Sequence, residues 1–132
     1  MVTEQYKDAI YFSSLFAWHY PNVYKEISDI LVYHHIEHGT LLHTKDYWCR
    51  DYMPIQWGFK SYIQFRYEPD YLKDKPQYKT NIIPVLKAMS RDMDITQSPL
   101  IVDGGNVVVC EANSKWIGSF TVSYTHLTLP TN

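Results

Sequence analysis

The stretch Thr44–Gln56, with the sequence TKDYWCRDYMPIQ, is the most informative part of this chain. It sets acidic, basic and aromatic residues side by side and closes with a proline. An ordinary surface loop would dilute such residues with Ser, Gly and Asn. A core strand would not hold Asp46, Arg50 and Asp51 so close together, because buried charge is costly unless it is paired. The stretch therefore predicts the wall of a site, where a charged ligand lies against an aromatic face.

A second acidic stretch, Ile101–Val108, has the same character, with the sequence IVDGGNVV. Its carboxylate, Asp103, is followed by Gly104 and Gly105, which can let the backbone approach a ligand closely or adopt a positive φ. We predict that the two stretches form half of one pocket. The simpler alternatives are an Asp51 paired with a neighbouring Arg, and an Asp103 that only opens a hairpin turn.

Length and composition are those of a globular protein. The chain has 132 residues, enough for one domain with a modest core. Hydrophobic residues make up 45% and charged residues 20%, which argues against disorder. Aromatic residues reach 16%, as expected for a sheet-rich fold or for a pocket built from flat side chains. The formal charge of −2 gives no reason to expect a nucleic-acid partner.

The chain reads as a cytoplasmic protein without a membrane partner. Its N-terminus lacks the basic and apolar regions of a secretory signal, and no apolar run is long enough to cross a bilayer. Cys49 and Cys110 are far apart, and each falls in a stretch that we expect to be a strand. They are typical of reduced, buried thiols rather than of a disulfide.

Hydrophobic periodicity predicts alternating strands and helices. The expected order is a strand within 8–13, a helix from Pro21 to about Gly39, an extended segment over 52–56 before a Trp57-Gly58 turn, a strand over 59–66, a loop over 68–78, a helix capped by Thr80, and strands at 100–102, 107–110 and from 115. The inward stripes are Val23, Ile27, Ile30 and Leu31 in the first helix, and Ile82, Ile83, Leu86 and Met89 in the second. This order suggests a repeated small α/β unit.

The end of the chain differs from the rest. Residues 123–132, SYTHLTLPTN, show neither a clear period nor a capped ending. They resemble translated vector or adaptor sequence, so we take 122–132 as a non-native tail and 1–121 as the domain. We expect the native protein to continue beyond Thr121.

Two ordered motifs carry a family resemblance. Thr44–Gln56 followed by Asp103–Asn106 closely resembles the bacterial-type peptidylarginine deiminase and agmatine deiminase family, over about residues 8–118. The resemblance implies an α/β propeller (pentein-like) of five pseudo-repeated units, of which this chain would hold roughly the first two. It also implies that Asp51 and Asp103 are catalytic residues that grip the substrate guanidinium, with Trp48 as the aromatic beside the substrate.

The resemblance implies an enzyme that hydrolyses agmatine to N-carbamoylputrescine and ammonia, or peptidyl-arginine to citrulline and ammonia, without a cofactor. The family's His-x-Asp pair and its nucleophilic Cys in a Gly-rich motif have no counterpart in this sequence. We therefore expect the fragment itself to be inactive and the longer parent protein to be the enzyme. The alternative is a non-catalytic guanidinium-binding module or a structural module of the same fold.

Two further alternatives concern single residues. Trp48 is as well explained by a core position, which is where Trp in a sheet-rich protein usually lies. His34 and His38 would lie one helical turn apart and could suggest a metal site. They fall where the helix should end, so we assign a solvated helix end and predict no metal.

Overall fold

The structure, a computed structural model, describes residues 9–89, 91–110 and 115–118, with the side chains of 108–110 and 115–118 left aside. The predicted tail at 122–132 lies outside the described residues. The chain divides into two compact units, which are described separately below. The first unit comprises 1–49 and 75–93, and the second comprises 50–74 and 94–132.

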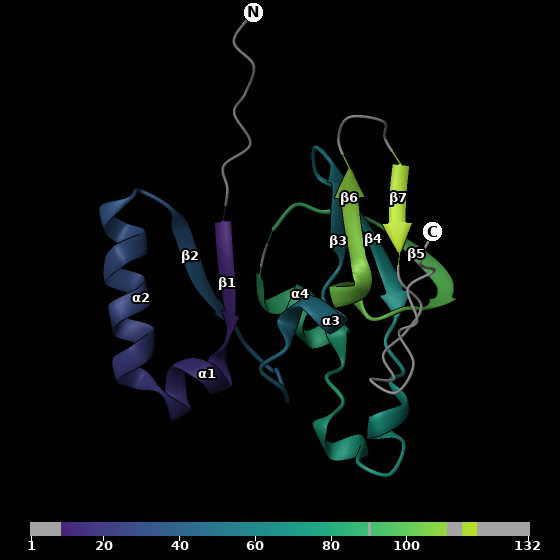
Figure 1. The fold of residues 1–132 in the computed structure, drawn as a ribbon, viewed down its shortest axis with the longest axis horizontal. Helices are drawn as coiled ribbons and strands as arrows, with labels where there is room; N and C mark the ends of the chain where they lie inside the picture. The colour runs from purple at the N-terminus through teal and green to yellow at the C-terminus, as the bar shows by residue number, and fades with distance from the viewer. Residues whose placement is uncertain (1–8, 90, 111–114, 119–132) are drawn as a thin grey trace, which may run out of the picture. The chain divides into compact units, whose positions relative to one another are not determined.

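The first unit is built on a pair of parallel strands (Figure 1). Its elements are β1 (Ala9–Ser13), α1 (Ser14–His19), α2 (Pro21–Tyr33), β2 (Glu37–Leu41), the 3₁₀ turn η2 (Pro76–Tyr78) and α4 (Ile82–Met89). β1 and β2 pair in parallel from Ala9↔Glu37 to Ser13↔Leu41, and α1 and α2 make the crossover that parallel strands require. The predicted first strand and the helix start at Pro21 are confirmed.

The predicted end of the first helix at Gly39 is wrong. α2 ends at Tyr33, and Gly39 lies within β2. The N–H of Ile36 donates to the carbonyl of Leu31 at 2.9 Å, and that of His35 to the carbonyl of Val32 at 3.0 Å. These bonds form a Schellman motif, with His35 in the left-handed position at φ 57°. A His takes the place that Gly usually fills, which is why glycine placement predicted the wrong end.

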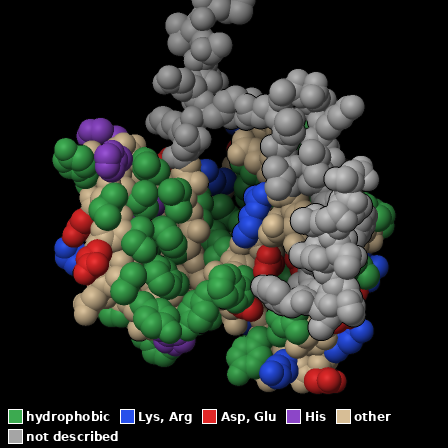
Figure 2. Space-filling model, viewed as in Figure 1, with side chains coloured by type: hydrophobic (Ala, Val, Ile, Leu, Met, Phe, Trp, Pro, Cys, Tyr) green, Lys and Arg blue, Asp and Glu red, His purple; other side chains and the backbone are tan. Residues whose placement is uncertain are grey.

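The inward stripe of α2 is also narrower than predicted. Leu31 is buried, whereas Val23 and Ile30 are exposed. Figure 2 shows hydrophobic side chains gathered over α1 and α2 on the face in view.

The second long helix, α4, is capped by a different residue than predicted. The side chain of Asn81 accepts the N–H of Ile83 at 3.1 Å, as an N-cap does. Thr80 is buried and instead accepts the N–H of Lys45 at 3.0 Å. Of the apolar side chains of α4, Val85 is fully buried, while Ile83 from the predicted stripe is exposed.

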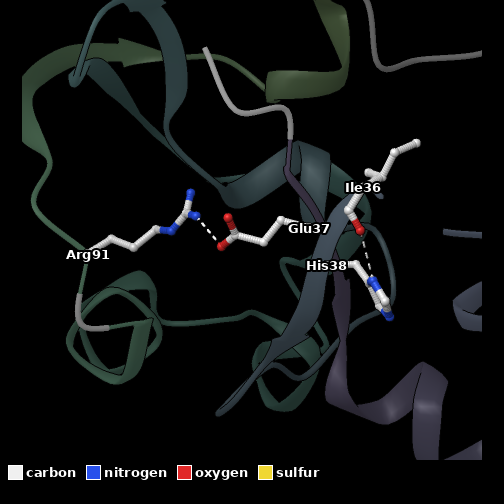
Figure 3. Close-up of polar contacts among 4 residues, drawn as sticks. All are labelled: Ile36, Glu37, His38 and Arg91. Atoms are coloured by element: carbon white, nitrogen blue, oxygen red, sulfur yellow. Dashed lines mark hydrogen bonds and ion pairs between the residues drawn. The ribbon is translucent and has the colours of Figure 1, made fainter. Parts of the chain in front are cut away.

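Hydroxyl groups and one arginine hold the first unit together. The hydroxyls of Ser13, at the end of β1, and of Thr44, three residues after β2, lie 2.7 Å apart, and both side chains are buried. Arg91, after α4, forms an ion pair of 2.5 Å with Glu37 of β2 (Figure 3). The guanidinium also lies over the ring of Tyr11 in β1, 5.2 Å from its centre, so Arg91 ties the segment after α4 to both strands.

The second unit contains a three-stranded sheet and a separate strand pair (Figure 1). Its elements are α3 (Cys49–Tyr52, which begins at the last residue of the first unit), β3 (Ile55–Gly58), β4 (Ser61–Arg66), η1 (Asp70–Leu72), β5 (Asp94–Ile101), η3 (Gly104–Asn106), β6 (Val107–Cys110) and β7 (Lys115–Gly118). The sheet order is β3-β4-β5, with β3 antiparallel and β5 parallel to β4. β6 and β7 pair antiparallel in a sheet of their own.

Several predicted boundaries in this unit shift. Trp57 and Gly58 belong to β3, and the chain turns at the next two residues, where Lys60 has φ 55°. Pro99 lies inside β5, where the β4–β5 register shifts and a proline is tolerated. In β4, Gln64 is buried, although the alternation of apolar and polar residues over 59–66 predicts that its side chain faces outward. The loop predicted over 68–78 contains η1 and η2.

The described residues thus mix helices with small parallel and antiparallel sheets. The five-unit propeller stays a prediction. Within the described ranges, no helix combines the length and apolar character needed to cross a membrane.

The left-handed His35 generates a stability prediction. His35→Gly should raise the free energy of unfolding by about 1 kcal/mol, because Gly removes the cost of placing a side chain in this conformation. His34→Gly is the matched control, since His34 has φ −90° and gains nothing from Gly. Urea unfolding followed by circular dichroism measures both, and equal effects at the two positions would contradict the assignment.

Candidate functional site

Three segments of the second unit meet at one edge of its sheet. β4 and β5 are parallel, so the residues that follow them, 67–72 and 102–106, leave at the same edge. β3 is antiparallel to β4, which places the preceding helix α3 at that edge as well. The carboxyl ends of parallel strands are where open α/β sheets place their ligands.

Hydrogen bonds fix these segments to one another. The amide of Gln64 in β4 donates to the carbonyl of Tyr52 at 3.1 Å and so anchors the end of α3. The N–H of Val102 donates to the carbonyl of Arg66 at 3.2 Å and joins the two segments that leave β4 and β5. Gln64 is not among the predicted site residues, since its place in an alternating strand predicts an outward side chain.

The two predicted acidic motifs come together at this edge. The N–H of Gly105 donates to Oδ1 of Asp51 at 3.1 Å. Arg50 donates from Nη2 to the carbonyl of Val107 at 3.0 Å. This bond ties α3 to the start of β6. Residues 50 and 51 are thus both bonded to the second motif.

Both glycines allow this approach. A Cβ at Gly104 would overlap the carbonyl oxygen of Arg50, and one at Gly105 would overlap the carboxylate of Asp51. Neither glycine has a positive φ. Of the two predicted roles, a positive φ or a close approach of the backbone, the structure shows the close approach, and the partner that comes close is α3 rather than a ligand. Packing of backbone on backbone brings Asp51 to the second motif.

The local structure around Asp51 differs from the prediction in one respect. The chain is helical over Cys49–Tyr52, and the extended segment begins only after it. Cys49 is a half-buried cysteine in this helix rather than in a strand.

Asp103 is a buried carboxyl group with an unusual electrostatic environment. Its residue is only 5% exposed, and Oδ2 has no hydrogen-bond partner among the residues that the structure describes. Burial raises the pKa of Asp103 above the ordinary value, and the negative charges of Asp51 and then Asp70 raise it further. The hairpin alternative for Asp103 is wrong, because β5 and β6 belong to different sheets.

Asp70 is a third carboxylate that the sequence analysis did not single out. It begins η1, four residues after the end of β4, and its charge acts on Asp103. The signal that could have found it is the pairing of β4 with β5, since residues that follow two parallel neighbours emerge together. In the sequence alone Asp70 lies in an ordinary polar loop.

Trp48 belongs to the first unit. Its residue is 65% exposed, and its N–H donates to Oδ1 of Asp46 at 3.0 Å. The core alternative for Trp48 is therefore wrong, and its place beside the substrate stays a prediction.

The histidines after α2 do not share a helical face. His34 is the C-cap directly after α2, whereas His38 lies in β2, where its Nδ1 is 3.2 Å from the carbonyl of Ile36 (Figure 3). No group of three His, Cys, Asp or Glu in the described ranges is arranged to hold a metal ion.

The glycine packing generates a stability prediction. Gly104→Ala should lower the free energy of unfolding by about 1–3 kcal/mol, because the backbone of α3 must move to make room. Gly58→Ala is the control within the same unit, since its Cβ would meet Ser61 Cβ at an ordinary 3.6 Å. Urea unfolding of the two variants measures the effect. If Gly104→Ala is as stable as the original, the close approach of α3 to Gly104 is contradicted.

Asp103 generates a pH prediction. Its raised pKa means that the folded state binds the proton more tightly than the unfolded state does. Stability should therefore fall as pH rises from the ordinary Asp value through the folded pKa. Asp103→Asn, which carries no charge, should melt at a higher temperature than the original at pH 7 and match it near pH 3. Asp74→Asn, at an exposed site, should show no such difference.

Comparison with protein-family models, with curated proteins and with solved structures found no match to this chain. The assignment of a function therefore depends on the chemistry of Asp51, Asp103 and their surroundings.

Proposed function

We propose that this chain carries the guanidinium-binding carboxylates of a guanidine deiminase, in which Asp51 and Asp103 grip the substrate. The observation that supports the proposal is the meeting of the two acidic motifs. The N–H of Gly105 donates to Asp51, and Gly105 follows the buried Asp103 by only two residues in the chain. The negative charge of Asp51 raises the pKa of Asp103. The resemblance of both motifs to the deiminase family supplies the reaction.

A guanidinium suits this pair of carboxylates. It is a planar cation with N–H donors in a fixed fork, and a carboxylate binds it through parallel N–H···O bonds. Oδ2 of Asp103 is a buried acceptor without a hydrogen-bond partner in the described part of the chain. A bound guanidinium would donate to it and would neutralise the repulsion between Asp103 and Asp51. The site therefore gains most from a cation that has donors on several edges.

The reaction proposed for the parent protein is hydrolysis of the guanidinium. Two carboxylates on different edges keep the positive charge on the nitrogens and leave the central carbon open to attack. A cysteine thiolate forms a bond to that carbon, and the C–N bond breaks with release of ammonia. Water then forms the C–O bond as the C–S bond breaks, which regenerates the thiol and gives the ureido product.

The substrates proposed are agmatine, which gives N-carbamoylputrescine, and peptidyl-arginine, which gives citrulline. We place the protein in the cytoplasm and invoke no cofactor, nucleic acid or membrane. A non-catalytic guanidinium-binding module is the second candidate. Oδ2 of Asp103, which has no hydrogen-bond partner among the described residues, favours this module as much as the enzyme, since binding needs the carboxylates and not the thiolate.

Calorimetry on this chain tests the grip. Agmatine should bind saturably, and Asp51→Ala or Asp103→Ala should weaken binding by about 30-fold or more, because each leaves a charged partner unpaired. Asp74→Ala removes an exposed carboxylate and is the charge-matched control. Equal weakening by all three variants would show that only net charge matters, and no heat with the original chain would contradict the grip by Asp51 and Asp103 in this chain.

Ammonia release separates the enzyme from the binding module. A longer form of the protein that includes the His-x-Asp and Cys motifs should release ammonia from agmatine or from a peptidyl-arginine. Asp51→Asn in that form should abolish release with little change in melting temperature. Binding without ammonia from either compound would leave the binding module as the function.

A further inference from the structure

The proposed function leaves open whether the substrate is agmatine or peptidyl-arginine, and the inference below rests on that proposed function. We propose that Asp70 makes the site selective for a dication, a guanidine that carries a primary ammonium at the far end of a short alkyl chain. Such a compound is agmatine. A peptidyl-arginine, whose far end is an uncharged peptide backbone, lacks the group that Asp70 would bind.

The position of Asp70 follows from the sheet. Asp70 lies on the segment that leaves β4, and Asp103 on the segment that leaves the parallel neighbour β5. The bond from the N–H of Val102 to the carbonyl of Arg66 holds the two segments together where they leave the sheet. Asp70 thus lies on a segment that leaves the sheet at the same edge as Asp103, and its negative charge acts on that group. Asp103 is buried and is called the inner position below, and the exposed Asp70 is called the outer position.

The turn that carries Asp70 is anchored on the core. The ring of Tyr67 packs against the buried ring of Tyr52, with centres 5.8 Å apart, and its hydroxyl lies 3.0 Å from that of Tyr71. Leu72, at the end of η1, is also buried. Asp70 itself faces solvent, with its side chain 88% exposed. A fixed turn therefore presents an accessible carboxylate.

Two observations point to a ligand with two cationic ends. At the inner position, the buried Asp103 has an oxygen without a hydrogen-bond partner in the described residues, which calls for a donor. At the outer position, Asp70 already holds a primary ammonium, that of Lys73, at 2.6 Å. This pair is exposed and so contributes little stability, which means that a ligand ammonium can replace Lys73 at small cost.

Charge then discriminates between the substrates. A dication supplies a guanidinium to Asp51 and Asp103 and an ammonium to Asp70. A guanidine with an uncharged far end supplies only the first, and Asp70 stays with Lys73. The difference between the two ligands is the one ammonium–carboxylate contact.

Calorimetry with two probes tests the selectivity. Agmatine and 1-butylguanidine share the guanidine and the four-carbon chain, and only agmatine has the ammonium. The original chain should bind agmatine up to about fivefold more tightly, as expected for an exposed ion pair. Asp70→Asn should bring the ratio of affinities to about one. Lys73→Met should raise the ratio, because it removes the internal competitor.

Controls keep the result specific. Asp74→Asn and Lys75→Met change neighbouring exposed charges and should leave the ratio as it is. All four substitutions are at exposed side chains, so melting temperatures should stay close to the original. If both probes bind equally, or the ratio persists in Asp70→Asn, the role of Asp70 is overturned while the guanidinium grip stands. If neither probe binds, the grip and the selectivity fall together.

Discussion

The approach of the Gly104-Gly105 backbone to α3 is the constraint on which the site depends. Any side chain at Gly104 would overlap the carbonyl of Arg50, and any side chain at Gly105 would overlap the carboxylate of Asp51. Without Cβ atoms, the N–H of Gly105 reaches Asp51 and fixes it. Asp103, which directly precedes Gly104, is then buried close to the negative charge of Asp51. Two motifs far apart in sequence become one site through backbone packing.

This arrangement costs stability in the absence of a cation. Oδ2 of Asp103 is buried without a hydrogen-bond partner in the part of the chain that the structure describes, which is unfavourable, and a like charge beside it adds to the penalty. A neutral residue in place of Asp103 would remove this penalty, but the buried carboxylate acceptor would be lost with it. In the function proposed here, a bound guanidinium would donate to the buried carboxyl oxygen and offset this penalty.

The sequence predicted the parts of this structure that local chemistry determines. Pro21 marked a helix start because its missing N–H is harmless there, and the acidic motifs marked Asp51 and Asp103 because charge is rarely concentrated without a partner. It could not predict β2, since Glu37-His38-Gly39-Thr40 lacks an apolar pattern and forms a strand only by pairing with β1. The helix end at His35, the inward Gln64 and the place of Asp70 at the same edge of the sheet as Asp103 likewise depend on contacts that periodicity does not encode.

The polar density of Thr44–Gln56 has two separate causes. Thr44 is buried against Ser13, and the backbone of Lys45 is bound by Thr80, so the first residues of the stretch are structural anchors of the first unit. Asp51 belongs to the second unit and is bonded to Gly105. The density of polar residues alone predicted that the whole stretch forms the wall of a site. Its first part, Thr44 and Lys45, instead holds the loop in place. The chemistry proposed for this protein therefore rests on the second part, where a carboxylate is positioned by a backbone that only glycine permits.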